Sequence, residues 1–499
     1  MADRTVLSGG LVVSGPAWVP GHADLLVDGT TIEAVGAPGD FDHVDATRVD
    51  LRDRLIVPGL VNAHLHSHNM VARGAARDWT LEASLLHGGW MSATRRLELV
   101  ELCALLAGAE TMASGATGAF DLMAWDGVPE PDALLAAADA YTRVGLRVRL
   151  APMVADRTIH EAVPAVGGCC TPSGATPATV APTVAPTAAP TAAILAACER
   201  FVRDLEPLAD MTAGLAPTIP SHCSTELMVG LRRLADRHGL PLHLHLAESK
   251  PQAISAADRY GHSITVELDR IGLLDGPLTA AHAIWIDDAD IELLARSSAV
   301  VVTVPGSNLR LGSGLAPTRA LVDAGVVLAV GSDGANSADA LDVLDAARLA
   351  NLVSRTSTTG PRGWLTVEQT LDAATEGGAA ACGWSDSARI EAGRRADLTV
   401  LDLRAAAFCP PNDVANQLLT AARSGDVTDV MSAGRFRLRD GAVVGVDVGR
   451  ARARFAELAE ELLAGVGERR DLAGEQVQAA AGALDDLRQR PWPVTRLLP

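Results

Sequence analysis

Histidines spaced two residues apart occur twice in this chain, each time at the end of an apolar run. His64 and His66 stand in PGLVNAHLHSH, and His243 and His245 stand in PLHLHLAES. If these segments are β-strands, residues i and i+2 point to the same face of the sheet. Two imidazoles that share a face at a strand end can bind one metal ion, so both pairs contain candidate ligands.

The second pair also suggests which residues reach the metal. His245 is nearer to the end of its strand than His243, which lies one pleat deeper, so we take His245 as a ligand and His243 as a barrel-interior residue. Glu248 follows where the strand turns into its loop, and there it could reach a water molecule beside the metal. Taken alone, Glu248 is better explained as a solvated loop glutamate.

Two further strand ends carry a polar group. His282 stands at the end of the strand-like part of LTAAHAIWI, and Asp333 stands at the end of the strand-like part of VVLAVGSDGANS. An isolated histidine on an apolar strand is more often a core residue, whereas a buried carboxylate is costly unless it is paired or binds a metal. In combination with the histidine pairs, these residues predict a hydrolytic site with imidazole and carboxylate ligands and an open position for water.

The elements that must position these groups alternate between strand and helix along the middle of the chain. Eight segments resemble buried strands, and amphipathic segments such as 95–114 and 224–239 lie between them. This pattern predicts an α/β fold in which a (β/α)8 TIM barrel carries its catalytic groups at the C-terminal strand ends. The strand-like segments are 59–66, 115–123, 147–153, 212–218, 241–248, 278–284, 299–305 and 326–333.

Both ends of the chain are rich in short strands and tight turns. Residues 25–36 alternate around Asp28-Gly29, and residues 429–447 contain Asp440-Gly441, which are hairpin signals. We expect residues 1–58 and 391–449 to form one small β-sandwich domain attached to a barrel of residues 59–390. The remaining residues, 450–499, show helical spacing and are expected to pack on the barrel or on a second subunit.

One segment interrupts the barrel pattern. Residues 171–193 repeat the unit APT and contain no charged residue. Such a composition cannot bury a core and favours extended backbone, so we predict a disordered insertion. Because it follows the third strand, an alternative is that it forms a lid over the active-site face.

Composition limits the partners and the compartment. The 499 residues carry a formal net charge of −19, which argues against binding to nucleic acid or anionic membranes. The seven cysteines include no CxxC pair, the N-terminus has no apolar leader segment, and no apolar run reaches 18 residues. The cysteine pattern therefore favours a cytoplasmic location. We also expect a homodimer that acts on a small molecule.

The motifs in their order resemble the amidohydrolase superfamily. The similarity is to the branch that contains S-adenosylhomocysteine, methylthioadenosine and guanine deaminases and triazine hydrolases, and it extends from about residue 5 to residue 450. The matching segments are VPGLVNAHLHSH, RGAARDWTLEASL, GAETMASGATGAFDL, HLHLAES, AAHAIWI, GSNLRLGSGLAP, GSDGANS and IEAGRRADLTVLDL.

This resemblance implies roles for particular residues. It implies one divalent metal per subunit, usually zinc and sometimes iron, bound by four ligands: His64, His66, His245 and Asp333. It makes Glu248 a proton shuttle, places His282 and Asp333 among the catalytic groups, and assigns four residues to the substrate: Glu82, Thr218, Thr303 and Asn308.

This chain departs from the family pattern at positions that face the substrate in the family. Relatives often carry histidines where this chain has Thr218 and Thr303, and some carry Trp in place of Ser84. His222 lies a few residues beyond Thr218 and is either a compensating group or a surface-loop histidine, two alternatives of equal weight. We expect a metal-dependent hydrolase that deaminates an aminated N-heterocycle through a metal-activated hydroxide. The alternatives are hydrolysis of an amide, a urea or a substituted triazine by the same site, or a catalytically silent binding protein on the same fold.

Overall fold

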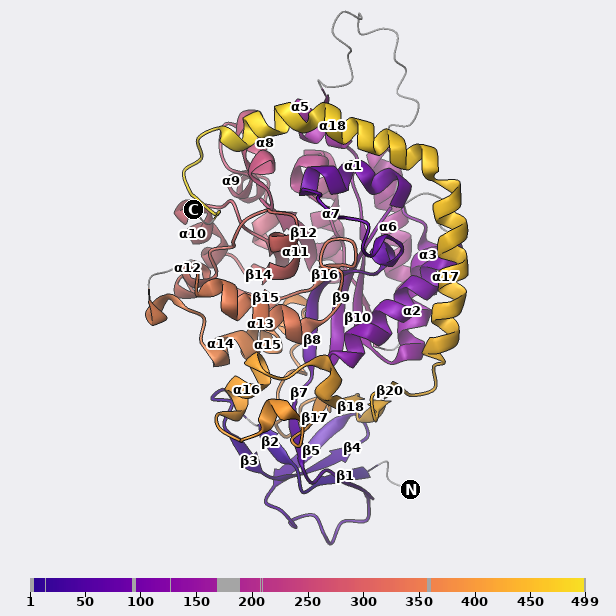
Figure 1. Cartoon of the computed structure of the whole chain (residues 1–499), viewed down its shortest axis with the longest axis vertical. Helices are drawn as coiled ribbons and strands as arrows, with labels where there is room; N and C mark the ends of the chain where they lie inside the picture. Colours follow the sequence, from indigo (N-terminus) through magenta and orange to yellow (C-terminus); the bar gives the residue numbers. More distant parts are fainter. Residues whose placement is uncertain are drawn as a thin grey trace, which may run out of the picture.

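The computed structural model describes residues 4–13, 15–91, 96–125, 127–167, 189–206, 208, 210–356 and 360–497. A barrel of parallel strands surrounded by helices forms the larger part, and a smaller β-rich lobe is attached below it (Figure 1). The eight barrel strands, the last of them in two pieces, are β8 Leu60–His66, β9 Ala116–Ala124, β10 Arg147–Met153, β11 Met211–Ala213, β12 Leu242–Leu246, β13 Leu278–His282, β14 Val300–Thr303, and β15 Val327–Val330 with β16 Asp333–Gly334.

The strands form two parallel ladders that adjoin each other on both sides. The ladders run through β11-β10-β9-β8-β16 and through β12-β13-β14-β15. On one side, Leu215 forms a parallel bridge with Leu242. On the other side, β15 continues into β16, which pairs with β8 through Asp333 and Leu65. The predicted TIM barrel is therefore confirmed, and each strand lies within or close to its expected segment.

Two strands are shorter than expected because their ladders are interrupted. The segment after β11 contains Pro217, which has no N–H to donate to a ladder. This segment runs alongside β12 and is joined to it by separate hydrogen bonds, from His243 N to Leu215 O and from His245 N to Thr218 O. The last strand breaks at Gly331, whose N–H donates to Thr303 O (3.1 Å). Both interruptions lie at the C-terminal end of the barrel, where the candidate residues stand.

Helices cover the outside of the barrel. Their ends follow local signals: α7 begins after Ser224, whose hydroxyl accepts from Leu227 N, and ends at Gly239 in a left-handed conformation. The helices around the barrel are α1 Leu81–Met91, α2 Leu97–Ala113, α3 Pro131–Val144, α4 Ile159–Ala162, α5 Pro164–Gly167, α6 Thr191–Leu205, α7 Thr225–His238, α8 Lys250–Tyr260, α9 Ile264–Arg270, α10 Asp288–Arg296, α11 Pro305–Arg310, α12 Thr318–Asp323, α13 Val343–Ser354, α14 Val367–Ala373 and α15 Glu376–Ala381.

The low-complexity segment lies mostly outside the described residues. Of the expected insertion 171–193, only residues 189–193 are described. Thr191 begins α6, so the last three residues of the expected insertion form the first turn of a regular helix.

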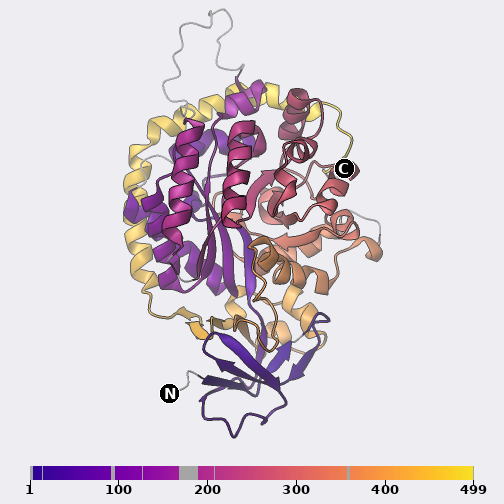
Figure 2. The same ribbon diagram turned by 180° about the vertical axis from the view of Figure 1, so that it is seen from behind.

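Both ends of the chain build the β-rich lobe (Figure 2). β17 pairs antiparallel with β7, so that Leu398 lies opposite Pro58, which is 340 positions earlier in the sequence. The strands are β1 Arg4–Ser8, β2 Leu11–Val13, β3 Pro20–His22, β4 Asp24–Asp28, β5 Thr31–Gly36, β6 Thr47–Asp50, β7 Arg54–Pro58, β17 Leu398–Asp402, β18 Val427–Ser432, β19 Arg435–Arg439 and β20 Ala442–Val443, with α16 Val414–Thr420 beside them.

A long helical arm follows β20 and runs along the barrel to its upper face (Figure 1). Its helices are α17 Val448–Gly465, which packs on α2, and α18 Gly467–Gln489, which packs on α1, α5 and α8. Exposed ion pairs accompany this packing, among them Arg454 with Glu98 and Arg490 with Asp258. In the described part of the chain, no helix is both long and apolar enough to cross a membrane.

Candidate metal centre

The C-terminal ends of four barrel strands bring the predicted polar residues together. β8 supplies His64 and His66, β12 supplies His245, β13 supplies His282 and β16 supplies Asp333. Each residue is buried, with at most 6% of its surface exposed. Burial of this many polar groups is unfavourable unless they share partners or a ligand.

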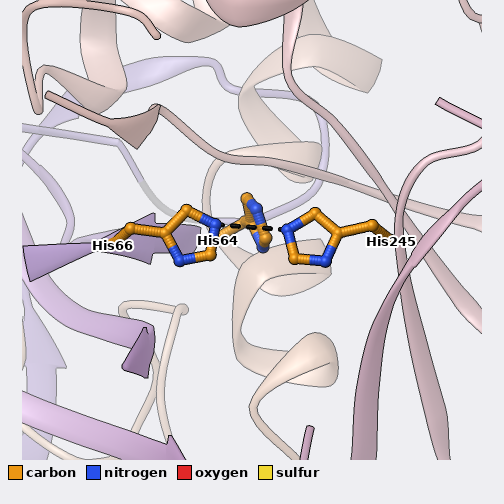
Figure 3. Close-up of side chains that lie close together, drawn as sticks. All are labelled: His64, His66 and His245. Atoms are coloured by element: carbon orange, nitrogen blue, oxygen red, sulfur yellow. Dashed lines mark hydrogen bonds between the residues drawn. The ribbon is translucent and has the colours of Figure 1, made fainter. Parts of the chain in front are cut away.

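Two of the imidazoles are held by backbone carbonyls. His66 donates from Nδ1 to Leu122 O, and His245 donates from Nδ1 to Thr218 O, both at 2.7 Å. In a neutral ring this leaves Nε2 with its lone pair. The two Nε2 atoms face each other at 3.2 Å (Figure 3), an arrangement that two lone pairs do not favour by themselves but that a cation beside both would stabilise.

The other two imidazoles also direct Nε2 into the cluster. Nδ1 of His64 lies 3.0 Å from Nε2 of His243, which stands behind it in the barrel. Nε2 of His64 and Nε2 of His282 are buried without a hydrogen-bond partner in the described residues. Unpartnered buried nitrogens are costly, so both atoms are available to a ligand.

Asp333 completes the donor set. Its Oδ1 lies 3.4 Å from Nε2 of His66 and 3.8 Å from Nε2 of His64, and its Oδ2 lies 4.0 Å from Nε2 of His282. The donor atoms of His64, His66 and His245 lie within 4.8 Å of one another, as do those of His64, His282 and Asp333. Neutral nitrogens around one carboxylate oxygen fit a divalent cation such as zinc, in both chemistry and spacing.

The protonation states of these residues also favour binding of a divalent cation. Burial and the neighbouring histidines lower the pKa of His64 well below its ordinary value and that of His245 to about 3. Burial alone would raise the pKa of Asp333, but His66, His282 and the hydroxyl of Ser307 together hold it below its ordinary value. Neutral imidazoles and an ionised carboxylate are the forms that bind metal ions.

The backbone is strained at two of these positions. His282 and Asp333 both have φ of 69°, in the left-handed region that residues other than glycine adopt rarely. Aspartate and histidine tolerate this region better than branched residues do. Such strain persists only where the surrounding structure maintains it, and it is typical of functional sites.

Glu248 lies beside the cluster. Its Oε2 is 3.6 Å from Nε2 of His282, and only 2% of the residue is exposed. Burial and the negative charges of Asp333 and Glu82 raise the pKa of Glu248 well above its ordinary value. The alternative of a solvated loop glutamate is therefore wrong, because this carboxyl is buried and readily protonated.

The residues predicted to contact the substrate do not all line one cavity. Thr218 lines a cavity of about 140 Å³ in front of His66, His245, Glu248 and Asp333. Glu82 does not line this cavity but lines the neighbouring one, where its carboxylate accepts hydrogen bonds from Ser249 Oγ and Arg488.

Thr303 and Asn308 do not line the cavity. Thr303 ends β14 with 3% of its surface exposed, and Oδ1 of Asn308 accepts a hydrogen bond from Nδ1 of His282 (2.8 Å). Asn308 thus lies behind the catalytic candidate His282. His222 is buried beside Arg259 and likewise does not line the cavity.

Sequence reasoning missed several residues of the cavity wall. His68, two residues after His66, lines the cavity. Asn336 also lines it and donates from Nδ2 to Ser84 Oγ (3.3 Å). The continued alternation at His68 and the motif around Asn336 were signals that could have identified them. Met91, Met153, Ile219 and Leu311 add apolar surface.

Comparison with known proteins identifies the family of this chain. The model of the Amidohydrolase family matches residues 55–437. A 5-methylthioadenosine/S-adenosylhomocysteine deaminase from Haloarcula marismortui is 31% identical over 475 residues, which are 93% of this chain and 100% of that protein.

Solved structures of other proteins have the same fold as this chain. An adenosine deaminase from Xanthomonas campestris with bound zinc is 28% identical, with a TM-score of 0.81 over 93% of this chain and 99% of that chain. An atrazine chlorohydrolase from Arthrobacter aurescens complexed with zinc is 23% identical, with a TM-score of 0.81 over 91% of this chain and 100% of that chain. The second similarity concerns the fold alone.

Proposed function

Because this chain belongs to the amidohydrolase family and is a hydrolase of C–N bonds, we propose that it deaminates an aminated N-heterocycle with one zinc ion per subunit. This proposal depends on one observation: Nε2 of His66 lies 3.2 Å from Nε2 of His245, and both atoms stand beside the carboxylate of Asp333 with their lone pairs free for a metal.

Four groups would hold the metal: Nε2 of His64, Nε2 of His66, Nε2 of His245 and the carboxylate of Asp333. A divalent cation at such a site supplies a Lewis acid and lowers the pKa of water that it binds. His243 and the carbonyls of Leu122 and Thr218 orient the imidazoles from behind, as outer hydrogen-bond partners of metal ligands commonly do.

The remaining groups move protons. The raised pKa of Glu248 keeps a proton on its carboxyl, which can be donated to a ring nitrogen of a substrate in the cavity. The ionised Asp333 can accept a proton from the attacking water. The proton that Asp333 takes from water can then pass to the departing amine, and the hydroxyl proton released as the new carbonyl forms restores Glu248. His282, whose Nδ1 donates to Asn308, presents Nε2 as a second acceptor facing Glu248.

The substrate is proposed to be an adenosine-type nucleoside. The relatives at 31% and 28% identity are named as deaminases of 5-methylthioadenosine, S-adenosylhomocysteine and adenosine. Thr218 is the observation that favours a second candidate, hydrolysis of a different C–N or C–X bond, because it lines the cavity where relatives often carry histidine.

Ammonia release tests the proposal. Purified protein with measured zinc content would be incubated with adenosine derivatives, guanine, aminated pyrimidines, triazines and ureas. Ammonia and the hydroxylated product from an adenosine derivative are expected. Release of an amine or halide without ammonia would instead support the second candidate, and the absence of any product with zinc bound would support a binding protein.

We also propose that the enzyme is a cytoplasmic homodimer. The support for the cytoplasmic location is compositional, because the seven cysteines include no CxxC pair. Light scattering coupled to size-exclusion chromatography would give twice the mass of the 51.7 kDa chain for a dimer.

A further inference from the structure

A second compartment adjoins the metal cavity. Its volume is about 200 Å³, and Leu81 and Leu311 line both spaces. Ser249, which follows Glu248 directly, also lines the second compartment. A group bound there would therefore lie next to the residues proposed to move protons.

The C-terminal segment, defined here as Arg488–Leu497, builds one wall of this compartment. Five of its residues line the space: Arg488, Trp492, Val494, Thr495 and Leu497. The opposite wall comes from α1, the start of α8 and the loops after β13 and α11. Segments about 400 residues apart in the sequence thus enclose one space.

Several hydrogen bonds anchor the C-terminal segment at this place. Trp492 donates from Nε1 to Trp285 O (3.3 Å), and Arg496 donates to Ile284 O (2.9 Å) and to Ile286 O (2.6 Å). Leu315 N donates to Arg496 O (2.8 Å). The bonds from Trp492 and Arg496 reach the loop that directly follows His282, so the segment is held against the active-site face.

The charges inside the compartment are unbalanced. Arg488 lies 3.1 Å from the buried carboxylate of Glu82 and balances its charge. Lys250 donates from Nζ to Arg488 O (2.7 Å) and lies 5.7 Å from the ring centre of Trp285. Among the described residues, Lys250 forms no ion pair with a carboxylate, so one positive charge remains for a bound group.

We propose that the C-terminal segment is a specificity-determining wall of the substrate site. The compartment receives the substituent that the heterocycle carries away from its amino group. The apolar part of that substituent packs against Trp285 and Trp492, and an anionic end, such as a carboxylate, pairs with Lys250. This inference rests on the proposed deamination of a substituted heterocycle.

Two substrates that differ only at the end of the substituent test the proposal. S-adenosylhomocysteine carries a carboxylate beyond its thioether, and 5-methylthioadenosine does not. In Lys250→Met, KM for S-adenosylhomocysteine should rise about 10-fold, the usual scale for losing a charged hydrogen bond, while KM for 5-methylthioadenosine, both kcat values and the zinc content stay unchanged. Lys250→Arg should restore most of the loss.

Trp492→Ala tests the apolar wall. KM should rise for both substituted substrates, whereas KM for adenosine, which lacks the thioether, should change little. Arg469→Gln is the matched control, because Arg469 is exposed on the same α18 and does not line the compartment. Equal losses on all three substrates, or none, in Lys250→Met and Trp492→Ala would overturn the proposal.

A binding measurement separates this inference from the proposed function. Titration calorimetry of S-adenosylhomocysteine into Glu248→Gln protein requires no turnover. Weaker binding after Lys250→Met is added supports the compartment even if the native enzyme releases no ammonia, a result that would refute the proposed function alone. Failure of S-adenosylhomocysteine to bind, or binding that Lys250→Met leaves unchanged, refutes the compartment.

Discussion

His66 and His245 present Nε2 to Nε2 at 3.2 Å, although each ring already donates its Nδ1 proton to a backbone carbonyl. Leu122 belongs to β9 and Thr218 to the segment that follows β11, so the barrel backbone determines which nitrogen of each ring faces inward. The contact between the two Nε2 atoms is unfavourable without a cation, and the Nδ1 hydrogen bonds hold the rings in this orientation.

His245→Ala should remove zinc and activity together, because one of the proposed ligands is lost. Metal content by mass spectrometry and ammonia release would be measured on the same sample. His238→Ala, an exposed histidine at the end of α7, is the matched control and should retain both. Stoichiometric zinc in His245→Ala would show that the ligand assignment is wrong.

Glu248→Gln should keep zinc and lower kcat by about 10²- to 10⁴-fold, the usual scale for removing a general acid–base group. The amide preserves the shape of the side chain but cannot supply the proton that the raised pKa of Glu248 retains. Steady-state kinetics with metal analysis would check this. Undiminished turnover would exclude Glu248 from the mechanism.

Asn308→Ala should lower kcat by about 10- to 100-fold with zinc content unchanged, the range found for outer partners of functional imidazoles. The reason is that Nδ1 of His282 loses the oxygen that orients the ring. Asn308→Asp, which keeps an acceptor oxygen, should recover part of the loss. If Asn308 contacts the substrate instead, as the family resemblance implies, KM will rise while kcat is preserved.

His222 should make the stability of the metal-free protein depend on pH. Burial, with a smaller effect of Arg259, lowers the pKa of His222 to about 4 from 6.5. The unfolded chain binds this proton below pH 6.5 and the folded chain only below about 4, so stability is full above 6.5 and falls as the pH drops toward 4.

Urea unfolding at pH 7.5 and pH 5 would measure this effect. His222→Gln, which cannot titrate, should lose about 2 kcal/mol less stability over that interval than the native chain, given a shift of this size. Because both proteins keep the other buried histidines, their difference isolates His222. An equal loss in the two proteins would show that the pKa of His222 is the same in the folded and the unfolded chain.

The sequence by itself determined the barrel and the identity of the clustered residues. His64 and His66 share a face because side chains alternate along a strand, and His245, His282 and Asp333 join them because parallel strands end at one edge. These relations depend only on periodicity and strand order, which the printed chain contains. The composite β lobe was also predictable, because the hairpin signals recur at both ends.

Only the tertiary structure decided how these residues are used. Periodicity does not tell which imidazole nitrogen faces inward. The family resemblance placed Asn308 at the substrate, whereas in the structure Asn308 lies behind His282. Periodicity assigned no chemistry to the C-terminal helices, yet Arg488 reaches Glu82 across 406 positions. Such contacts depend on the path of the whole chain in space, which no local pattern of residues records.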